Sequence, residues 1–281
     1  LVRRYSDNDD SNNNTTTDDG KTDTSKDDNN STDTGNDQTP TDDEDTVSDP
    51  TMDGSSVKGW YQLQKKLESA KKSSRVKIYL NGTSLVPADI INAGINKKLT
   101  LEFVVNDSIS WVVDCGKLNK TVSSMSAGVR TKDVYIPSVL IDGSGDSEII
   151  RLHTYGRNKI GAVLYVKTGC TTKNRFANLF RFNESTNQLD FTSTSKITTS
   201  TGTARLTPDR SGDYVIMLDT VTRLPGDADN STVVDLKDAL AILKMCVGLM
   251  EKDETADYNG DGFVNIDDAR DILNASVGLM K

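Results

Sequence analysis

The spacing of apolar residues divides the chain into three parts. Residues 1–54 contain almost no apolar side chains, and residues 55–221 alternate between apolar and polar positions over many short stretches. Residues 222–281 carry apolar residues three or four positions apart. Alternation with a period of two is typical of β-strands, whereas the wider spacing is typical of amphipathic helices. We therefore predict a linker over residues 1–54, a central module over residues 55–221 and a small all-α module over residues 222–281.

The central module is predicted to combine helices with a sheet. Apolar residues recur at helical spacing over Val57–Lys72, and a shorter helix is expected after Pro87, since proline is favoured at helix starts. Strands are expected where alternating stretches lie between turn residues, at Val76–Leu80, Leu99–Val105, Ile109–Val113, Glu148–His153, Gly161–Val166, Gln188–Thr192 and Asp213–Leu218. These elements predict an α+β fold with a mostly antiparallel sheet.

The C-terminal module repeats itself at an interval of 30 residues. A shift of that length places Asp227 on Asp257 and Asp238 on Asp268, and it aligns a further run of apolar residues. Two copies of one supersecondary unit are the simplest explanation.

Each copy is a loop followed by an amphipathic stretch. The stretches are Leu236–Leu249 and Ile266–Leu279, each with one apolar stripe and with Gly248 or Gly278 placed to end a helix. We expect the two helices to pack on each other through these stripes about a pseudo-twofold axis.

The second loop has oxygen donors at alternate positions. Ca²⁺ binds about six to eight oxygen atoms, and a tight loop wraps it when donors stand at positions 1, 3, 5, 7, 9 and 12 and a glycine turns the chain at position 6. Gly262 occupies that turn, and Phe263 contributes a backbone carbonyl. The predicted ligands are Asp257, Asn259, Asp261, Phe263, Asn265 and Asp268.

The first loop follows the same spacing less regularly. Ser231 supplies a hydroxyl where the second loop has a carboxylate, and Thr232 stands where the second loop has glycine. A hydroxyl is a poorer calcium ligand, and a β-branched residue disfavours positive φ. We predict a weaker calcium site, with an empty loop as the alternative, formed by Asp227, Asp229, Ser231, Val233 through its carbonyl, Asp235 and Asp238.

A duplicated loop and helix with Asp238 or Asp268 closing each loop, and with no helix before the loop, resembles a dockerin. The resemblance covers about residues 223–281 and implies that Ca²⁺ is needed for folding, because the ligands come together only in the folded state. It further implies binding to a cohesin module of a scaffoldin or a cell-surface anchoring protein. The setting it implies is a cellulosome-like, polysaccharide-degrading complex, so the protein is expected to be secreted and extracellular or attached to the cell surface.

The resemblance also implies which residues contact the cohesin. In the first copy these are Leu236, Lys237, Leu240, Ala241 and Lys244. In the second copy they are Ile266, Asp267, Arg270, Asp271 and Asn274. Because the two sets differ in charge, we expect one preferred binding orientation rather than two equivalent ones.

The central module carries no recognisable catalytic motif, so we expect no enzymatic activity. The single histidine, His153, lies in a strand pattern and is interpreted as structural. The module loosely resembles X modules that accompany dockerins, which implies no defined activity. Its tyrosines and tryptophans, among them Trp60, Tyr79 and Tyr155, are candidate sugar-stacking residues, although core packing is the favoured interpretation for each ring.

Charge is distributed unevenly along the chain. The formal charge of −9 combines −12 over residues 1–54, +9 over residues 55–221 and −6 over residues 222–281. The first part is too polar to offset chain entropy by burial, so we expect it to be disordered. The basic central part lacks an aromatic-interleaved basic motif, which argues against nucleic acid as a partner.

Three further features concern the chain as a whole. No apolar run is long enough to span a membrane. The chain begins with Leu1, which we interpret as a fragment of a longer protein. Cys115, Cys170 and Cys246 are expected to be buried free thiols, with a disulfide between Cys115 and Cys170 as the alternative.

The expected function is therefore a non-catalytic assembly component, with the central module supporting the dockerin or acting as a spacer. Two alternatives stay open. One is a dockerin-borne protein that binds carbohydrate or a cell surface, and the other is the C-terminal part of a dockerin-bearing, polysaccharide-degrading enzyme.

Overall fold

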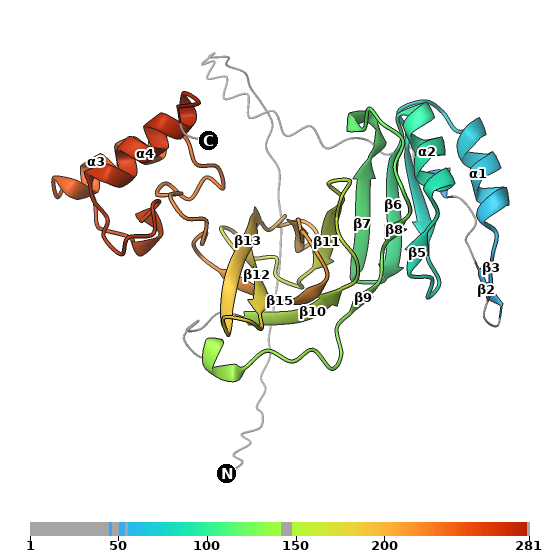
Figure 1. Cartoon of the computed structure of the whole chain (residues 1–281), viewed down its shortest axis with the longest axis horizontal. Helices are drawn as coiled ribbons and strands as arrows, with labels where there is room; N and C mark the ends of the chain where they lie inside the picture. Colours follow the sequence, from blue (N-terminus) through green and yellow to red (C-terminus); the bar gives the residue numbers. More distant parts are fainter. Residues whose placement is uncertain (1–44, 47–50, 54–55, 142–147, 280–281) are drawn as a thin grey trace, which may run out of the picture. The chain divides into compact units, whose positions relative to one another are not determined.

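A computed structural model describes residues 45–46, 51–53, 56–141 and 148–279. Over this part the fold is α+β, with four α-helices and mostly antiparallel sheets, as predicted (Figure 1). None of the helices described is long and apolar enough to cross a membrane. The disorder expected for residues 1–54 falls mainly on residues outside the described ones. Two short pieces of that segment, Asp45–Thr46 and Thr51–Asp53, are strands rather than a featureless linker.

The larger sheet has six strands in the order β1-β4-β6-β7-β11-β14. The first three are parallel, and the remaining pairs are antiparallel. Helix α2, Ala88–Lys97, lies in the crossover between parallel strands β4 and β6, because a parallel pair cannot be joined by a tight hairpin. The strands are β1 (Asp45–Thr46), β4 (Arg75–Tyr79), β6 (Thr100–Asn106), β7 (Ile109–Asp114), β11 (Val163–Lys167) and β14 (Thr203–Leu206).

The second sheet has five strands in the order β13-β12-β15-β10-β9, and every pair is antiparallel. Its strands are β9 (Val129–Arg130), β10 (Glu148–Thr154), β12 (Phe176–Asn183), β13 (Gln188–Lys196) and β15 (Gly212–Asp219). Two small antiparallel pairs complete the set, β2 (Thr51–Asp53) with β3 (Ser56–Lys58) and β5 (Leu85–Val86) with β8 (Met125–Ser126).

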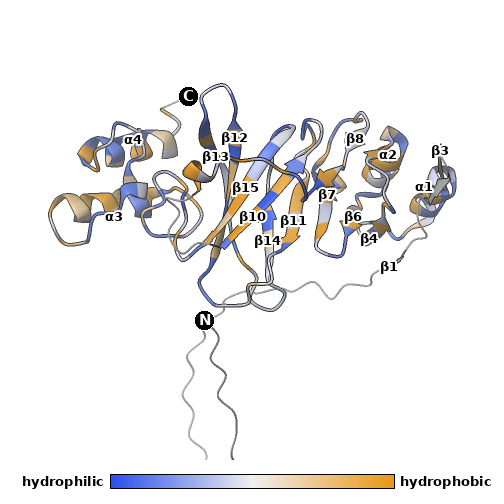
Figure 2. Ribbon diagram, turned by 90° about the horizontal axis from the view of Figure 1, so that it is seen from below, coloured by the Kyte–Doolittle hydropathy of each residue, from blue (hydrophilic) through white to orange (hydrophobic). Residues whose placement is uncertain are grey.

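One hydrophobic core joins both sheets and the first two helices. Phe103 of the larger sheet and Leu179 of the second are fully buried in it, as is Leu63 of helix α1, Trp60–Ser69. Each such side chain contributes roughly 1.5–3 kcal/mol through burial. Figure 2 shows hydrophobic residues along the strands of both sheets. Among the residues of the module that the structure describes, η1 (Cys115–Lys117) and η2 (Ser138–Leu140) are short 3₁₀ helices.

A separate small cluster covers the other face of the second sheet. Ile136 and Ile141, on either side of η2, pack with Val215 and Met217 of β15. Strand β15 therefore has apolar neighbours on both faces, which accounts for its nearly continuous apolar sequence.

The first predicted helix was too long at both ends. Val57 lies in strand β3, and α1 begins only at Trp60. Gly59, with φ of 99°, has a left-handed backbone conformation and cannot be part of the helix. The helix ends at Ser69, since Ala70 is extended. All seven predicted strands exist, with ends shifted by at most four residues. The sequence did not indicate β12, β14 or the strands of two or three residues, β1, β2, β3, β5, β8 and β9.

The C-terminal part, residues 222–281, contains helices α3 (Leu236–Cys246) and α4 (Ile266–Ser276) and the 3₁₀ helix η4 (Glu254–Ala256). Both α-helices end three residues earlier than predicted. Gly248 and Gly278 have φ of 76° and 72° and allow the chain to turn back on the last carbonyls. Ala239 and Ile242 of α3 pack with Ala269 and Ile272 of α4 in a core of their own.

The three cysteines are free. Cys115 is buried, as expected, and burial raises the pKa of its thiol to about 12. Cys170 is half-buried and Cys246 is exposed, so the prediction of burial was wrong for the latter, because position 246 lies on the outer side of α3.

Candidate metal centre and exposed helix faces

Asp227 begins the first loop and is fully buried. One carboxylate oxygen accepts the backbone N–H of Ser231 at 2.9 Å. The other accepts the N–H of Thr232 at 2.9 Å and the hydroxyl of Thr222 at 2.6 Å. The loop therefore folds around this carboxylate.

Asp238 closes the first loop and is also fully buried. It accepts the N–H of Asp229 at 3.1 Å and that of Asp235 at 2.8 Å. Asp235 and Asp238 form a capping box at the start of α3. The side chain of Asp235 accepts the backbone N–H of Asp238, and the side chain of Asp238 accepts that of Asp235. The first turn of the helix thus fixes the last donor of the loop.

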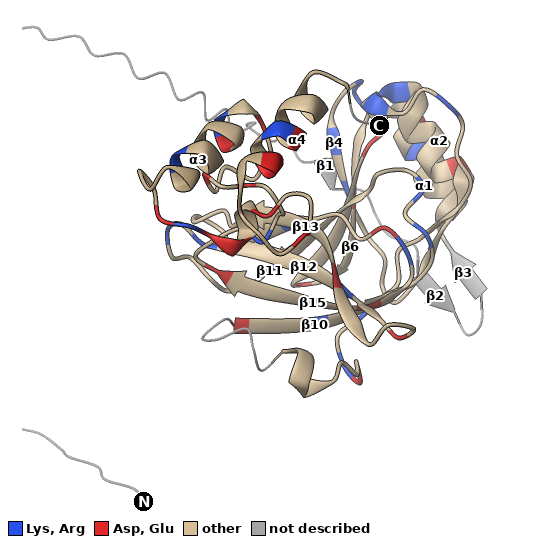
Figure 3. Cartoon of the chain, turned by 60° about the vertical axis from the view of Figure 1, so that its left-hand side comes forward, with Lys and Arg blue, Asp and Glu red and all other residues tan. Residues whose placement is uncertain are grey.

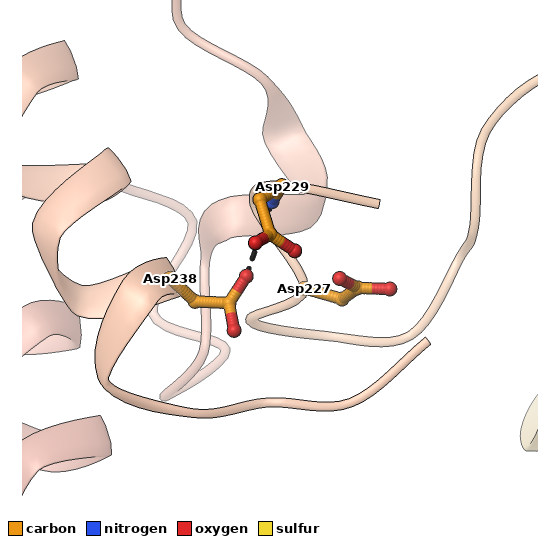
Figure 4. A group of neighbouring side chains, drawn as sticks. All are labelled: Asp227, Asp229 and Asp238. Atoms are coloured by element: carbon orange, nitrogen blue, oxygen red, sulfur yellow. Dashed lines mark hydrogen bonds between the residues drawn. The ribbon is translucent and has the colours of Figure 1, made fainter. Parts of the chain in front are cut away.

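Carboxylate oxygens of Asp227, Asp229 and Asp238 lie within 4.8 Å of one another, so this acidic trio can hold a metal ion (Figure 4). Burial raises the pKa of Asp238, and the negative charges of Asp229 and Asp227 add to that increase. A buried carboxylate with acidic neighbours needs a positive charge to remain ionised at low cost.

The donor set fits a hard cation. The partners of Asp227 and Asp238 are backbone amides and one hydroxyl, and no lysine or arginine in the described residues pairs with either carboxylate. All-oxygen donors of this kind suit Ca²⁺ or Mg²⁺ rather than a soft metal.

The second loop makes the same hydrogen bonds 30 residues further on. Asp257 accepts the N–H groups of Asp261 at 3.2 Å and Gly262 at 2.8 Å. Asp268 accepts the N–H groups of Asn259 at 3.2 Å and Asn265 at 2.9 Å. Asn265 and Asp268 form a capping box on α4 that matches the one on α3.

The donors at the middle of each loop are held by their own turns. In the first loop the hydroxyl of Ser231 donates to the carbonyl of Val233 at 2.9 Å. In the second, Asp261 accepts the N–H of Phe263 at 2.8 Å. The predicted ligands of each loop therefore lie on one continuous turn that closes on its first and last carboxylates.

The backbone turns of the two loops are alike although their residues differ. Thr232 has φ of 73° where Gly262 has 86°, and Asn230 has φ of 57° where Gly260 has 74°. Asparagine and glycine tolerate this region, but a β-branched residue is strained there. The first loop keeps the geometry of the second at the cost of strain at Thr232.

Large apolar side chains are exposed at equivalent positions of the two copies. Leu236 is 55% exposed and Ile266 is 64% exposed, at the first position of α3 and α4. The same holds further along for Val233 with Phe263, Leu243 with Leu273, Val247 with Val277 and Leu249 with Leu279. Exposed apolar residues gathered on so small a module are typical of an interaction surface.

The charged residues predicted to contact a partner differ between the helices (Figure 3). Lys237 and Lys244 are exposed on α3. On α4, Arg270 pairs with Asp267 at 2.6 Å and with Asp271 at 3.2 Å. The face of α3 is therefore basic, whereas on α4 one arginine is paired with two aspartates, which leaves a net negative charge.

The remaining predicted contact residues vary in accessibility. Leu240 is 53% exposed, and Asn274 is half-buried. Ala241 is only 7% exposed and packs in the core between α3 and α4. Its side chain therefore supports the helix pair instead of facing solvent, because position 241 lies beside the apolar stripe.

The residues that join strand β15 to the first loop are bonded on both sides, which sequence reasoning missed. Thr222 is fully buried and donates its N–H to Asn230 at 2.8 Å, in addition to its bond to Asp227. Arg223 donates its N–H to the side chain of Asn178 at 2.8 Å, and Asn178 donates to the carbonyl of Val221 at 3.1 Å. In the sequence, only the small number of residues between β15 and the first loop indicated that the two parts are in contact.

His153 pairs with Asp213 directly across strands β10 and β15, with Nδ1 2.5 Å from Oδ1. Its ring also contacts the ring of Tyr155 edge-on, with centroids 4.5 Å apart. These contacts account for the histidine within the sheet.

Comparison with known proteins yields no relative: no family model, no curated protein and no solved structure matches this chain.

Proposed function

We propose that residues 222–281 are a calcium-dependent docking module of the dockerin class, through which the protein binds a cohesin module of a scaffoldin or a cell-surface anchoring protein. The observation that carries this proposal is the duplication of one hydrogen-bond scheme around Asp227 and Asp257, each followed by a helix that exposes the same apolar positions. A duplicated loop of this kind supports a function that needs both the metal and the surface.

The proposed metal is Ca²⁺, with one binding site in each loop. Ca²⁺ accepts more oxygen ligands and less regular geometry than Mg²⁺, which suits loops built from carboxylates, amides and backbone carbonyls. The first site is the weaker, because Ser231 offers a hydroxyl and Thr232 must remain strained while the loop is closed.

The proposed cohesin-binding surface combines the exposed apolar residues with charges that differ between α3 and α4. Leu236 and Lys237 start one helix, and Ile266 and Asp267 start the other. A cohesin with an acidic patch matches α3 better than α4, so the complex has one preferred orientation.

In this account the protein is a non-catalytic, extracellular component of a cellulosome-like complex. The central module supports the docking module, since Asn178, Val221 and Thr222 link the second sheet to the first loop by hydrogen bonds. It can serve at the same time as a spacer.

The test is a pull-down of the whole chain by a panel of immobilised cohesins, in calcium and in EGTA. The paired change Asp238→Asn and Asp268→Asn replaces one buried carboxylate of each loop by a neutral amide, and Asp107→Asn with Asp133→Asn removes two exposed charges as a matched control. Capture in calcium, with loss in EGTA and in the loop variant but not in the control, is expected. Capture that survives EGTA, or no capture by any cohesin, contradicts the proposal.

A further inference from the structure

A pocket of about 310 Å³ lies in the central module, far from the repeat in sequence. Residues 123–126 and 154–160 line it, together with Leu85, Trp111, Pro208 and Arg210. Its floor is buried and mainly apolar, with Trp111 and Met125 among its residues. Its size is at the lower end of the range of small-molecule sites, roughly 300–1,000 Å³.

The walls of this pocket are held in place by hydrogen bonds between the segments. The side chain of Asn158 donates to the carbonyls of Ala162 at 2.7 Å and Pro208 at 3.0 Å. Thr154 donates to the carbonyl of Arg210 at 2.9 Å. Trp111 donates its indole N–H to Ala127 at 3.1 Å, which fixes the floor.

Tyr214 is fully buried and bonds to the segment that carries Arg210. Its hydroxyl has two acceptors within reach of its one proton, Asp209 Oδ1 at 3.0 Å and the carbonyl of Arg210 at 2.9 Å. Burial raises the pKa of the phenol to about 12. The phenol therefore stays protonated at neutral pH, and the segment 208–210 keeps its position. The pocket is preformed, which lowers the cost of binding a ligand.

The rim of the pocket is basic. Arg157, Lys159 and Arg210 all belong to its lining, and no acidic residue does. Arg210 is paired with Asp209, whereas Arg157 and Lys159 have no ionic or hydrogen-bonding side-chain partner among the described residues. Two uncompensated cations over a fixed floor favour an anionic ligand.

The same rim offers groups that recognise hydroxyls and a ring. Tyr155 is 43% exposed, and its ring is steadied by the edge contact with His153. Ser123, Ser124 and Ser126 supply hydroxyl groups that can both donate and accept. An exposed aromatic ring beside such groups suits a ligand with one apolar face and several hydroxyls.

We propose that this pocket binds an acidic sugar, with the anionic group between Arg157 and Lys159 and the ring against Tyr155. The anionic group can be a carboxylate or a phosphate ester, since guanidinium and ammonium groups bind both. The site is independent of the proposed docking function and lies on a different part of the chain.

The experiment titrates the whole chain at low salt, by NMR or calorimetry, with galacturonate, glucose 6-phosphate, glucose and inorganic phosphate. The variant Arg157→Ala with Lys159→Ala removes the two free cations. Lys71→Ala with Lys72→Ala removes two exposed lysines after α1 and is the matched control. Circular dichroism checks that both variants keep their fold.

At least one of the two acidic sugars is expected to bind, and glucose is expected to bind at least about tenfold more weakly. The affinity for the acidic sugar should fall about tenfold or more in the Arg157 and Lys159 variant and stay unchanged in the control. The proposal is overturned if neither acidic sugar binds, if glucose binds as well as they do, or if the variant binds normally. It is equally overturned if inorganic phosphate binds as tightly, because the ring is then not recognised.

Discussion

The loops 227–238 and 257–268 hold their first and last carboxylates in the same way, but they turn by different means. Loop 257–268 uses glycine at both positions of positive φ, whereas loop 227–238 uses Asn230 and Thr232. The donor positions are thus set by the hydrogen bonds to Asp227 and Asp238 strongly enough to hold a β-branched residue in an unfavourable conformation. A metal-binding geometry can persist after its most favourable turn residue has been replaced.

The helices that follow the loops share their apolar positions but not their charges. Their exposed apolar residues match between the copies, from Leu236 with Ile266 to Leu249 with Leu279, whereas their charged residues differ. The repeat therefore combines two matching frames with two distinct outer faces. The two copies should therefore differ in metal affinity, partner contacts and strain.

The largest effect is expected from removing a buried carboxylate from one loop at a time. Asp268→Asn should weaken calcium binding at the second loop by about 100-fold or more, because it removes a charged ligand, while the first loop continues to bind. Asp238→Asn should do the converse. Calorimetric titration of each variant of the whole chain should show the loss of one site, with Asp107→Asn as the control. Loss of both sites in one variant would show that the loops are not separate.

Partner contacts should distinguish the two faces next. Leu236→Ala with Lys237→Ala, compared with Ile266→Ala with Asp267→Ala, should give unequal losses. We expect about tenfold or more weaker cohesin binding for one pair and less than about threefold for the other.

Surface plasmon resonance with a cohesin captured in the pull-down measures this difference. Val139→Ala with Lys132→Ala, an exposed apolar and a basic residue of the central module, is the matched control. Equal losses from both pairs would replace a single orientation by two equivalent ones.

Strain gives a smaller effect with opposite signs in the two loops. Thr232→Gly should raise the free energy of unfolding of the repeat by about 1 kcal/mol, because glycine adopts φ of 73° without a steric penalty. Gly262→Thr should lower it by a similar amount.

Urea unfolding in saturating calcium, followed by helical circular dichroism, measures both changes. Thr201→Gly, at an exposed turn position without positive φ, should be neutral or destabilising. A destabilised Thr232→Gly variant would show that Thr232 is not strained.

The smallest effect concerns pH in the absence of calcium. The folded-state pKa of Asp238 is raised by burial and by Asp229 and Asp227, so the folded state binds a proton more readily than the unfolded state there. Its contribution to stability is present below the ordinary aspartate pKa and is lost as the pH rises through the raised value.

In EGTA, acidification from about pH 7 to about pH 4, near the ordinary aspartate pKa, should therefore stabilise the first loop and α3 through this group. Asp238→Asn should remove that gain. Thermal unfolding of both proteins at the two pH values measures it, and an equal response of the two proteins would show that Asp238 does not titrate in this range.

The repeat was largely predictable from the sequence because its signals are local. Its donors, capping residues and terminal glycines lie within about thirty residues of one another, and each acts through nearby backbone. The helices end earlier than predicted. The apolar stripe on which the prediction was based continues past Val247, but Gly248 has already turned the chain out of the helix.

The central module was less predictable because its signals are distant. Strand Phe176–Asn183 was missed since its apolar residues face two different clusters and its buried Asn178 is satisfied by Thr194, Val221 and Arg223. The basic pocket combines residues from Leu85 to Arg210, far apart in the sequence, so no local pattern indicated it.

Calcium-dependent folding of the repeat is tested by amide hydrogen exchange of the whole chain in calcium and in EGTA. The amides of α3 and α4 should be protected in calcium and exchange rapidly after chelation, while those of β12 and β15 of the central module should stay protected in both conditions. Equal protection of α3 and α4 with and without calcium would show that the metal does not hold the repeat together.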